Sequence, residues 1–151
     1  MKIGVVGFSS HNIDESLASR CLRTSFIELI KVNAHNGKPG EAATIEIVSG
    51  LTNIGVPKLA YQIADAENYF KVGISAQQAH EVDCGCYPVD KEIIVGRIFG
   101  DESETFIEYI DYLVRVGGGQ QSHRETELFR QKCTKNHWAL DQRLIEKDLQ
   151  Y

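Results

Sequence analysis

Short apolar runs alternate along this chain with longer segments in which apolar residues recur at helical spacing. The first run, residues 3–8, is interrupted only by small glycines and shows no polar alternation. Continuous runs of this length are typical of strands that are buried on both faces of a parallel sheet. Further runs predict strands at residues 44–48, 70–74, 92–99 and 112–116, with a final edge strand at 144–146.

The segments between these runs predict helices. From residue 13 to about 32, apolar residues repeat every three or four positions, and acidic residues near the start complement the helix dipole. Shorter helices are expected after Pro57, through Phe106 and Ile110, and from the late glycines to about Lys132. Strands that alternate with helices imply right-handed βαβ crossovers. The pattern therefore predicts one α/β domain over residues 1–151, with three layers and a mostly parallel sheet of five to six strands.

Composition and charge narrow the classes of partner. The chain is 42% hydrophobic and 25% charged, which is ordinary for a globular protein. Its net charge of -5 disfavours nucleic acid and anionic membranes, which both select clustered Lys and Arg. No window approaches the roughly eighteen apolar residues of a membrane span, and the N-terminal run is too short for a signal peptide. We expect a cytoplasmic protein whose four cysteines are free thiols.

Two glycine-bearing turns each follow a predicted strand and open a predicted helix. Glycine lets the backbone approach an anion closely, and the free N–H groups of the first helical turn then point at it. Both turns fall at the carboxyl edge of the sheet, where ligands of such folds bind. Taken singly, either turn could also serve only for tight packing. The candidate phosphate or nucleotide ligands are Gly50, Thr52, Asn53 and Gly55 in the early turn, and Gly117, Gly118, Gly119, Gln121 and Ser122 in the late one.

Neither turn carries a familiar cofactor fingerprint. Both lack the G-x-G-x-x-G pattern and the Lys-Ser/Thr of a Walker A loop, so classical NAD binding and ATP hydrolysis are not supported, and we expect no resident cofactor. His80, Cys84 and Cys86 are competent metal ligands, but the C-x-C spacing has no second cysteine pair. Free or packed thiols are favoured over zinc there, and no metal site is expected.

Read together, the two turns resemble those of the LONELY GUY and lysine-decarboxylase-like group of the SLOG superfamily. The segment Gly118–Glu125 is similar to that group's Gly-Gly-x-Gly-Thr-x-x-Glu turn, with Ser122 at the Thr position and Glu125 at the Glu. Residues 49–57 match the early Gly-Gly-x-x-x-Gly turn loosely, and the order of elements agrees from about residue 1 to 132. The resemblance implies a Rossmann-like, phosphate-binding domain that forms a homodimer and cleaves the N-glycosidic bond of a nucleoside 5'-monophosphate, with Glu125 catalytic.

Three departures from that pattern bear on catalysis. Gln121 and Leu51 each replace a family glycine, and residues 101–112 contain no arginine where the family has one. Glu125 supplies a carboxylate for an oxocarbenium-like transition state, but a leaving base normally needs an acid as well. Arg97, near the end of the predicted strand 92–99, is the stronger candidate for the cationic role. His123 and Arg124 are more typical of a solvated first helical turn.

The acidic segment after that strand has two interpretations. Asp101, Glu102 and Ser103 are possible ribose contacts, and they also form an ordinary helix cap in which Asp101 or Ser103 is the first residue. The sequence thus predicts a protein whose partner is a small phosphorylated ligand, a nucleotide. The function that the sequence favours is that of a phosphoribohydrolase, and the alternative is a non-catalytic nucleotide sensor or carrier. A single-stranded DNA-binding domain, as in the DNA-processing protein A branch, is disfavoured by the acidic charge.

Overall fold

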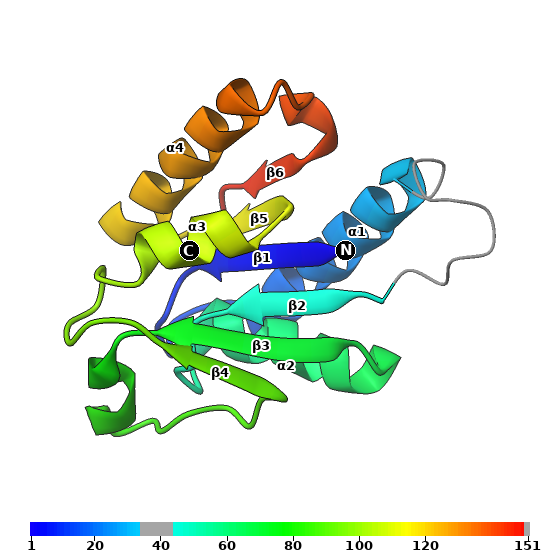
Figure 1. Cartoon of the computed structure of the whole chain (residues 1–151). Helices are drawn as coiled ribbons and strands as arrows, with labels where there is room; N and C mark the ends of the chain where they lie inside the picture. The colour runs from blue at the N-terminus through cyan, green and yellow to red at the C-terminus, as the bar shows by residue number, and fades with distance from the viewer. Residues whose placement is uncertain (34–43, 150–151) are drawn as a thin grey trace.

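A parallel sheet forms the centre of the protein. The computed structural model describes residues 1–33 and 44–149, and in this part of the chain six strands form one sheet in the order β4-β3-β2-β1-β5-β6, all parallel (Figure 1). This confirms the predicted α/β class. The strands are β1 Lys2–Gly7, β2 Glu46–Ser49, β3 Phe70–Ser75, β4 Lys91–Ile94, β5 Tyr112–Val116 and β6 Leu144–Lys147.

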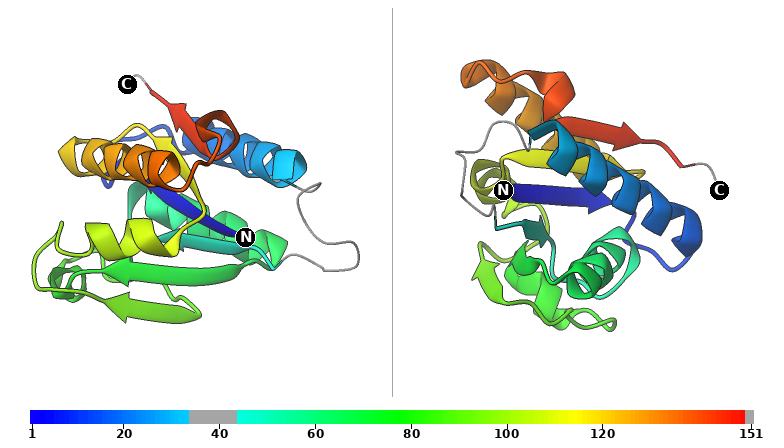
Figure 2. Two further views of the ribbon diagram at one scale, coloured as in Figure 1. Left: turned by 45° about the horizontal axis from the view of Figure 1, so that its top comes forward. Right: turned by 90° about the vertical axis from the view of Figure 1, so that its right-hand side faces the viewer.

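Helices cover both faces of this sheet and complete the Rossmann-like, three-layer arrangement (Figure 2). One apolar cluster joins α1 and α2 to residues of β1 and β5 such as Val5 and Val114. The other joins α3 and α4 to the opposite face, through residues such as Leu113 and Phe129. Neighbouring residues of β5 thus point to opposite layers, as the pleat requires. The helices are α1 Glu15–Asn33, α2 Gly55–Glu67, α3 Ser103–Tyr109 and α4 Gln120–Lys135, with short 3-10 turns at Gln77–Glu81 and Leu140–Gln142.

The order of the strands places the glycine turns side by side. The chain runs from β1 outward to β4, then returns to add β5 on the other side of β1. The connection after β1 runs toward β2, whereas the connection after β5 runs toward β6, so the two leave the carboxyl edge of the sheet in opposite directions. Ligands of open α/β sheets bind at such a switch point. The early turn follows β2 and the late turn follows β5, the two immediate neighbours of β1.

One predicted strand was too long. The strand expected at 92–99 ends at Ile94, because the chain turns there through two glycines with positive φ, Gly96 and Gly100. The Asp101 carboxylate holds this turn by accepting hydrogen bonds from the backbone N–H groups of Arg97 (2.9 Å) and Ile98 (3.2 Å). These bonds also lower the pKa of Asp101. Arg97 consequently lies in a turn and not in a strand.

The other boundaries agree closely with the pattern. Helix α2 begins at Gly55, two residues before Pro57, and α4 continues to Lys135. The expected last strand is present as β6, parallel to β5 at the edge of the sheet. No helix within residues 1–33 and 44–149 is both long and apolar enough to cross a membrane.

Tyr61 ties α2 to the strands beneath it, and its hydroxyl gives a test of this packing. The fully buried Oη lies 2.8 Å from the Ser49 carbonyl oxygen and 2.9 Å from that of Val72. Tyr61→Phe should lower the free energy of unfolding by about 1–2 kcal/mol, since a buried hydrogen bond is lost. Urea denaturation measures this, and Tyr69→Phe, at a partly exposed position, should change stability by less than about 0.5 kcal/mol. Equal effects at both positions would contradict the assignment.

Candidate functional site

A cavity of about 500 Å³ opens at the carboxyl end of the sheet, between the two glycine turns. The early turn contributes Gly50 and Thr52, and the late turn contributes Gly119, Gln121 and Ser122. The two predicted phosphate turns therefore line one cavity. The remaining lining comprises hydroxyl or thiol groups (Ser9, Ser49, Ser75, Cys84), apolar side chains (Val5, Val6, Ile54, Pro57, Ile74, Val82, Phe99, Phe106), Gly7, Gln120 and two carboxyl groups (Glu102, Glu125).

In the late turn, two glycines shape the backbone and the third faces open space. Gly117 and Gly118 have φ of +62° and +101°, values that side chains disfavour. A Cβ on Gly117 would lie 1.8 Å from the Phe8 ring, and one on Gly118 would lie 2.6 Å from Ser122 Oγ. A Cβ on Gly119 would meet nothing within 4 Å. Gly117 and Gly118 thus build the turn outside the cavity wall, while Gly119 borders the space for a ligand.

The first turn of α4 supplies the donors at this end of the cavity. Gly119 is the N-cap of α4 and makes no side-chain cap, so the N–H groups that follow it have no partner within the helix. The helix dipole adds a partial positive charge there. The Ser122 hydroxyl borders the cavity and makes one long hydrogen bond, 3.4 Å, to the Gly7 carbonyl oxygen. This is an anion-binding arrangement made of dipoles.

The early turn divides between the cavity and the protein interior. Gly50 and Thr52 face the cavity, whereas the Asn53 N–H donates to the Gly85 carbonyl oxygen at 2.9 Å. Gly55 packs so closely that a Cβ there would lie 2.2 Å from the Phe8 carbonyl oxygen. Leu51, which stands where the resembling family has glycine, is fully buried in the core.

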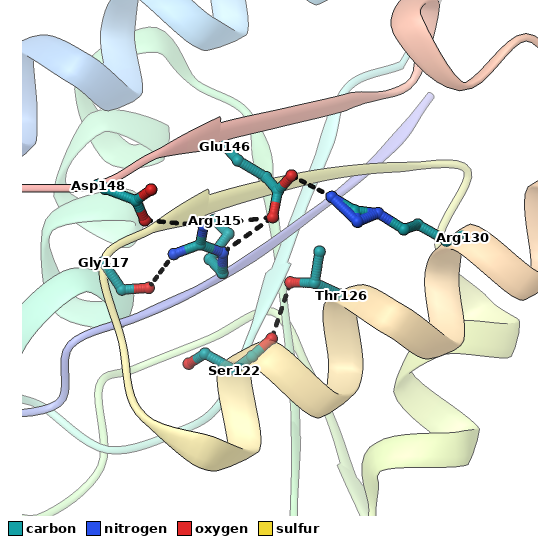
Figure 3. Close-up of polar contacts among 7 residues, drawn as sticks. All are labelled: Arg115, Gly117, Ser122, Thr126, Arg130, Glu146 and Asp148. Atoms are coloured by element: carbon teal, nitrogen blue, oxygen red, sulfur yellow. Dashed lines mark hydrogen bonds and ion pairs between the residues drawn. The ribbon is translucent and has the colours of Figure 1, made fainter.

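A buried arginine fixes the end of β5 (Figure 3). The Arg115 guanidinium donates to the Gly117 carbonyl oxygen at 2.8 Å and pairs with Glu146 at 3.2 Å and Asp148 at 2.9 Å. Arg130 reaches the other oxygen of Glu146 from α4. A buried charge needs such partners. This network, which the sequence did not reveal, holds β6 and α4 against the late turn.

Two carboxyl groups stand together in the cavity wall, where the start of α3 lies beside the first turns of α4. Glu102 and Glu125 are each 5% exposed, and Gln121 lies between them, its amide nitrogen 2.9 Å from Glu102 Oε1. The second oxygen of Glu102 accepts the Gly100 N–H at 3.0 Å. Burial, and then the charge of Glu102, raise the pKa of Glu125 to about 7, while Ser103, Arg124 and Gln121 lower it in part. Near neutral pH the Glu125 carboxyl group is therefore partly protonated.

The other residues singled out in the sequence lie elsewhere. Arg97, His123 and Arg124 are exposed, and none of them is part of the cavity lining. The Asp101 carboxylate accepts the backbone N–H groups of its own turn. Ser103 is buried beside the site, where its hydroxyl makes no hydrogen bond of regular geometry within the described residues. Of the three residues considered for ribose, only Glu102 lines the cavity.

The C-x-C segment borders the site without forming a metal centre. Cys84 lines the cavity, while Cys86 Sγ lies 3.7 Å from His80 Nδ1, and the other nitrogen of that ring contacts Glu92. Within residues 1–33 and 44–149, no three His, Cys, Asp or Glu side chains gather in a way that would hold a metal ion. All four cysteines are free thiols.

Known proteins resemble this chain in fold. No protein-family model matches the sequence, and no curated protein matches it either. The X-ray structure of TM1055, a structural genomics target, has 17% identity and a TM-score of 0.63 over 97% of this chain and 91% of its own.

Two further structures belong to proteins whose names state a ligand. A molybdenum cofactor carrier protein from Chlamydomonas reinhardtii has 19% identity and a TM-score of 0.59 over 96% of this chain and 74% of its own. The molybdenum cofactor binding protein of the phototrophic bacterium Rippkaea orientalis has 17% identity and a TM-score of 0.59 over 96% and 87%. These likenesses support the Rossmann-like fold.

The shifted pKa of Glu125 makes stability depend on pH. In the unfolded chain this carboxyl group titrates near 4.5, and in the folded protein at about 7, so the folded state binds the proton more tightly. Its contribution is complete below pH 4.5 and is lost as the pH rises to about 7, by roughly 3 kcal/mol. Glu125→Gln removes this loss, so the variant should gain stability relative to the wild type between pH 4.5 and 8.

Chemical denaturation at several pH values measures this difference. Glu127→Gln is the matched control, because Glu127 is exposed on the same helix. Its stability should follow the wild-type pH profile. Parallel profiles for Glu125→Gln and the wild type would contradict the burial of an ionisable Glu125.

Proposed function

We propose that this protein binds a small phosphorylated ligand of the nucleotide class in the cavity between the two glycine turns, and acts as its carrier or sensor. The observation that carries the proposal is the convergence of Gly50 and Thr52 with Gly119 and Ser122 on one cavity. Amide and hydroxyl donors at the start of α4 suit a phosphate. The apolar walls suit a flat ring.

The makeup of the lining favours binding over catalysis. Among the described residues, the lining contains no Lys, Arg or His side chain, so a phosphate would be held by dipoles alone. The resembling enzymes use an arginine, and Arg97 does not line this cavity. Two structures of similar fold belong to proteins named for carrying or binding the molybdenum cofactor, which is consistent with a carrier role.

A second candidate function, cleavage of a nucleotide N-glycosidic bond, is favoured by Glu125. A carboxyl group that is half protonated at neutral pH matches the general acid that a leaving base needs. Its neighbour Glu102, whose two oxygens each accept a hydrogen bond, matches the carboxylate that would stabilise positive charge on the sugar. Release of free base from nucleoside monophosphates, abolished in Glu125→Gln, is the result that this function requires.

A homodimer is part of the same proposal. Dimers are common in the group that the sequence resembles, and Ile27 and Ile98 are large apolar side chains that are 66% and 63% exposed on the isolated chain. Light scattering on the purified protein decides the oligomeric state directly.

Gly119→Ala tests the proposed phosphate end of the cavity. A Cβ at this position meets no protein atom within 4 Å and φ is negative, so the variant should fold normally. The methyl group would occupy ligand space beside the helix amides, so the affinity for ribose 5-phosphate should fall at least tenfold, about 1.4 kcal/mol. Isothermal titration calorimetry measures it.

Glu127→Ala, on the exposed face of the same helix, serves as the control and should bind as the wild type does. If Gly119→Ala binds ribose 5-phosphate unchanged, the phosphate does not lie at this turn. If the wild type shows neither binding nor thermal stabilisation with any nucleotide, the proposed function is wrong.

A further inference from the structure

Beyond the first-turn amides of α4, the cavity wall presents hydrogen-bond acceptors. Each oxygen of Glu102 already accepts one bond, from Gln121 and from Gly100, so this carboxylate is held in place. Glu125 lines the cavity, and the Ser103 hydroxyl and the Gln121 amide lie close enough to lower its pKa in part. A carboxylate has about four lone-pair sites, so both oxygens of Glu125 can accept further hydrogen bonds from a ligand. Gln121 spends an amide N–H on Glu102, which leaves its carbonyl oxygen as a further acceptor.

This acceptor cluster, Glu102, Gln121 and Glu125, excludes several kinds of ligand group. Two adjacent carboxyl groups repel a phosphate, so the anionic end of the ligand belongs at the glycine turns. No third acidic, His or Cys side chain joins them among the described residues, so the protein alone does not build a multidentate metal site there. What remains is a ligand group that donates hydrogen bonds.

The surroundings of the cluster favour a flat ring over a sugar. Phe106 lies one helical turn beyond Glu102, where its N–H bonds to the Glu102 carbonyl oxygen. It packs with Val6 and Ile74, and all three line the cavity. Acceptors set between apolar walls match the edge of a planar heterocycle, whose faces are apolar and whose rim carries the N–H groups.

We propose that Glu125, supported by Glu102 and Gln121, recognises the paired N–H donors of a 2-amino-4-oxopyrimidine ring, the edge that guanine presents. This inference rests on the proposed function, which it deepens by naming the class of ring. The ring N–H and the exocyclic amino group point in parallel and meet the two oxygens of one carboxylate, as a guanidinium does. Adenine offers a donor beside an acceptor, so its ring nitrogen would face a carboxylate oxygen.

The experiment compares GMP with IMP, which lacks only the exocyclic amino group, by calorimetry at pH 8. The wild type should bind GMP at least tenfold more tightly, because a hydrogen bond to a charged group is lost with IMP. In Glu125→Gln the ratio should fall below about threefold, and ribose 5-phosphate should still bind, which shows that the cavity is intact. Glu104→Gln is the matched control, because Glu104 is an exposed glutamate of α3. It should keep the wild-type ratio.

The pH dependence adds a readout that altered packing alone would not move. The charged groups around Glu125 are Glu102, from the start of α3, and Arg124, on α4. Since the ionised carboxylate is the double acceptor, the GMP preference should grow between pH 6 and 8 in the wild type and stay flat in Glu125→Gln. Equal affinity of the wild type for GMP and IMP overturns the inference.

The remaining outcomes are also decisive. If dGMP binds tenfold more weakly than GMP and Glu125→Gln abolishes that difference instead, Glu125 binds ribose hydroxyls and the inference is wrong. Binding of ribose 5-phosphate with no preference among bases overturns the inference but leaves the proposed function standing. If neither GMP nor ribose 5-phosphate binds, both fail.

Discussion

The close approach of both glycine turns to the end of β1 determines the shape of the site. Phe8, which follows β1, has its ring against Gly117 of the late turn and its carbonyl oxygen against Gly55 of the early one. Val56 donates its N–H to that same carbonyl oxygen at 2.7 Å. A side chain on either glycine would push the turns away from β1 and from each other. Both turns pack against Phe8, and the cavity forms between them.

The charged side chains near the site form two separate groups. The Arg115 guanidinium, paired with Glu146 and Asp148, holds the Gly117 carbonyl oxygen of the late turn and does not line the cavity. The cavity itself has helix-dipole donors at the start of α4, and the Glu102–Glu125 pair lies in its wall one helical turn further on. Burial, and then the charge of Glu102, raise the pKa of Glu125. A ligand with an anion at one end and N–H donors at the other fits this polarity.

Much of this arrangement could be predicted from the sequence, because it depends on residues that are close together along the chain. Apolar runs and helical periodicity predicted every strand and α-helix found in the described residues, but not the 3-10 helices Gln77–Glu81 and Leu140–Gln142, and the glycine turns were placed at the same sheet edge. The end of the fourth strand was missed because residues 95–99 continue its apolar pattern. A turn there is set by glycine conformations and by the Asp101 carboxylate, not by hydropathy.

The side chains that act across the fold were harder to find. Glu102 and Glu125 lie 23 positions apart, and only the packing of α3 on α4 brings their carboxyl groups together. Arg115 reads in sequence as a charge within an apolar strand, and its partners come from β6 and the residue after it. Arg97 was assigned to the site from the wrong strand boundary. Long-range contacts of this kind leave no trace in local periodicity.

The central claim is that a phosphate lies between the two turns, and an NMR titration tests it most directly. Ribose 5-phosphate added to the ¹⁵N-labelled protein should shift the backbone amides of Gly50, Thr52, Gly119 and Ser122 together, with one dissociation constant. The chemical shifts of the amides of α1 and β6 should not change. Shifts confined to another surface, or none at these four amides at saturating ligand, would contradict the account.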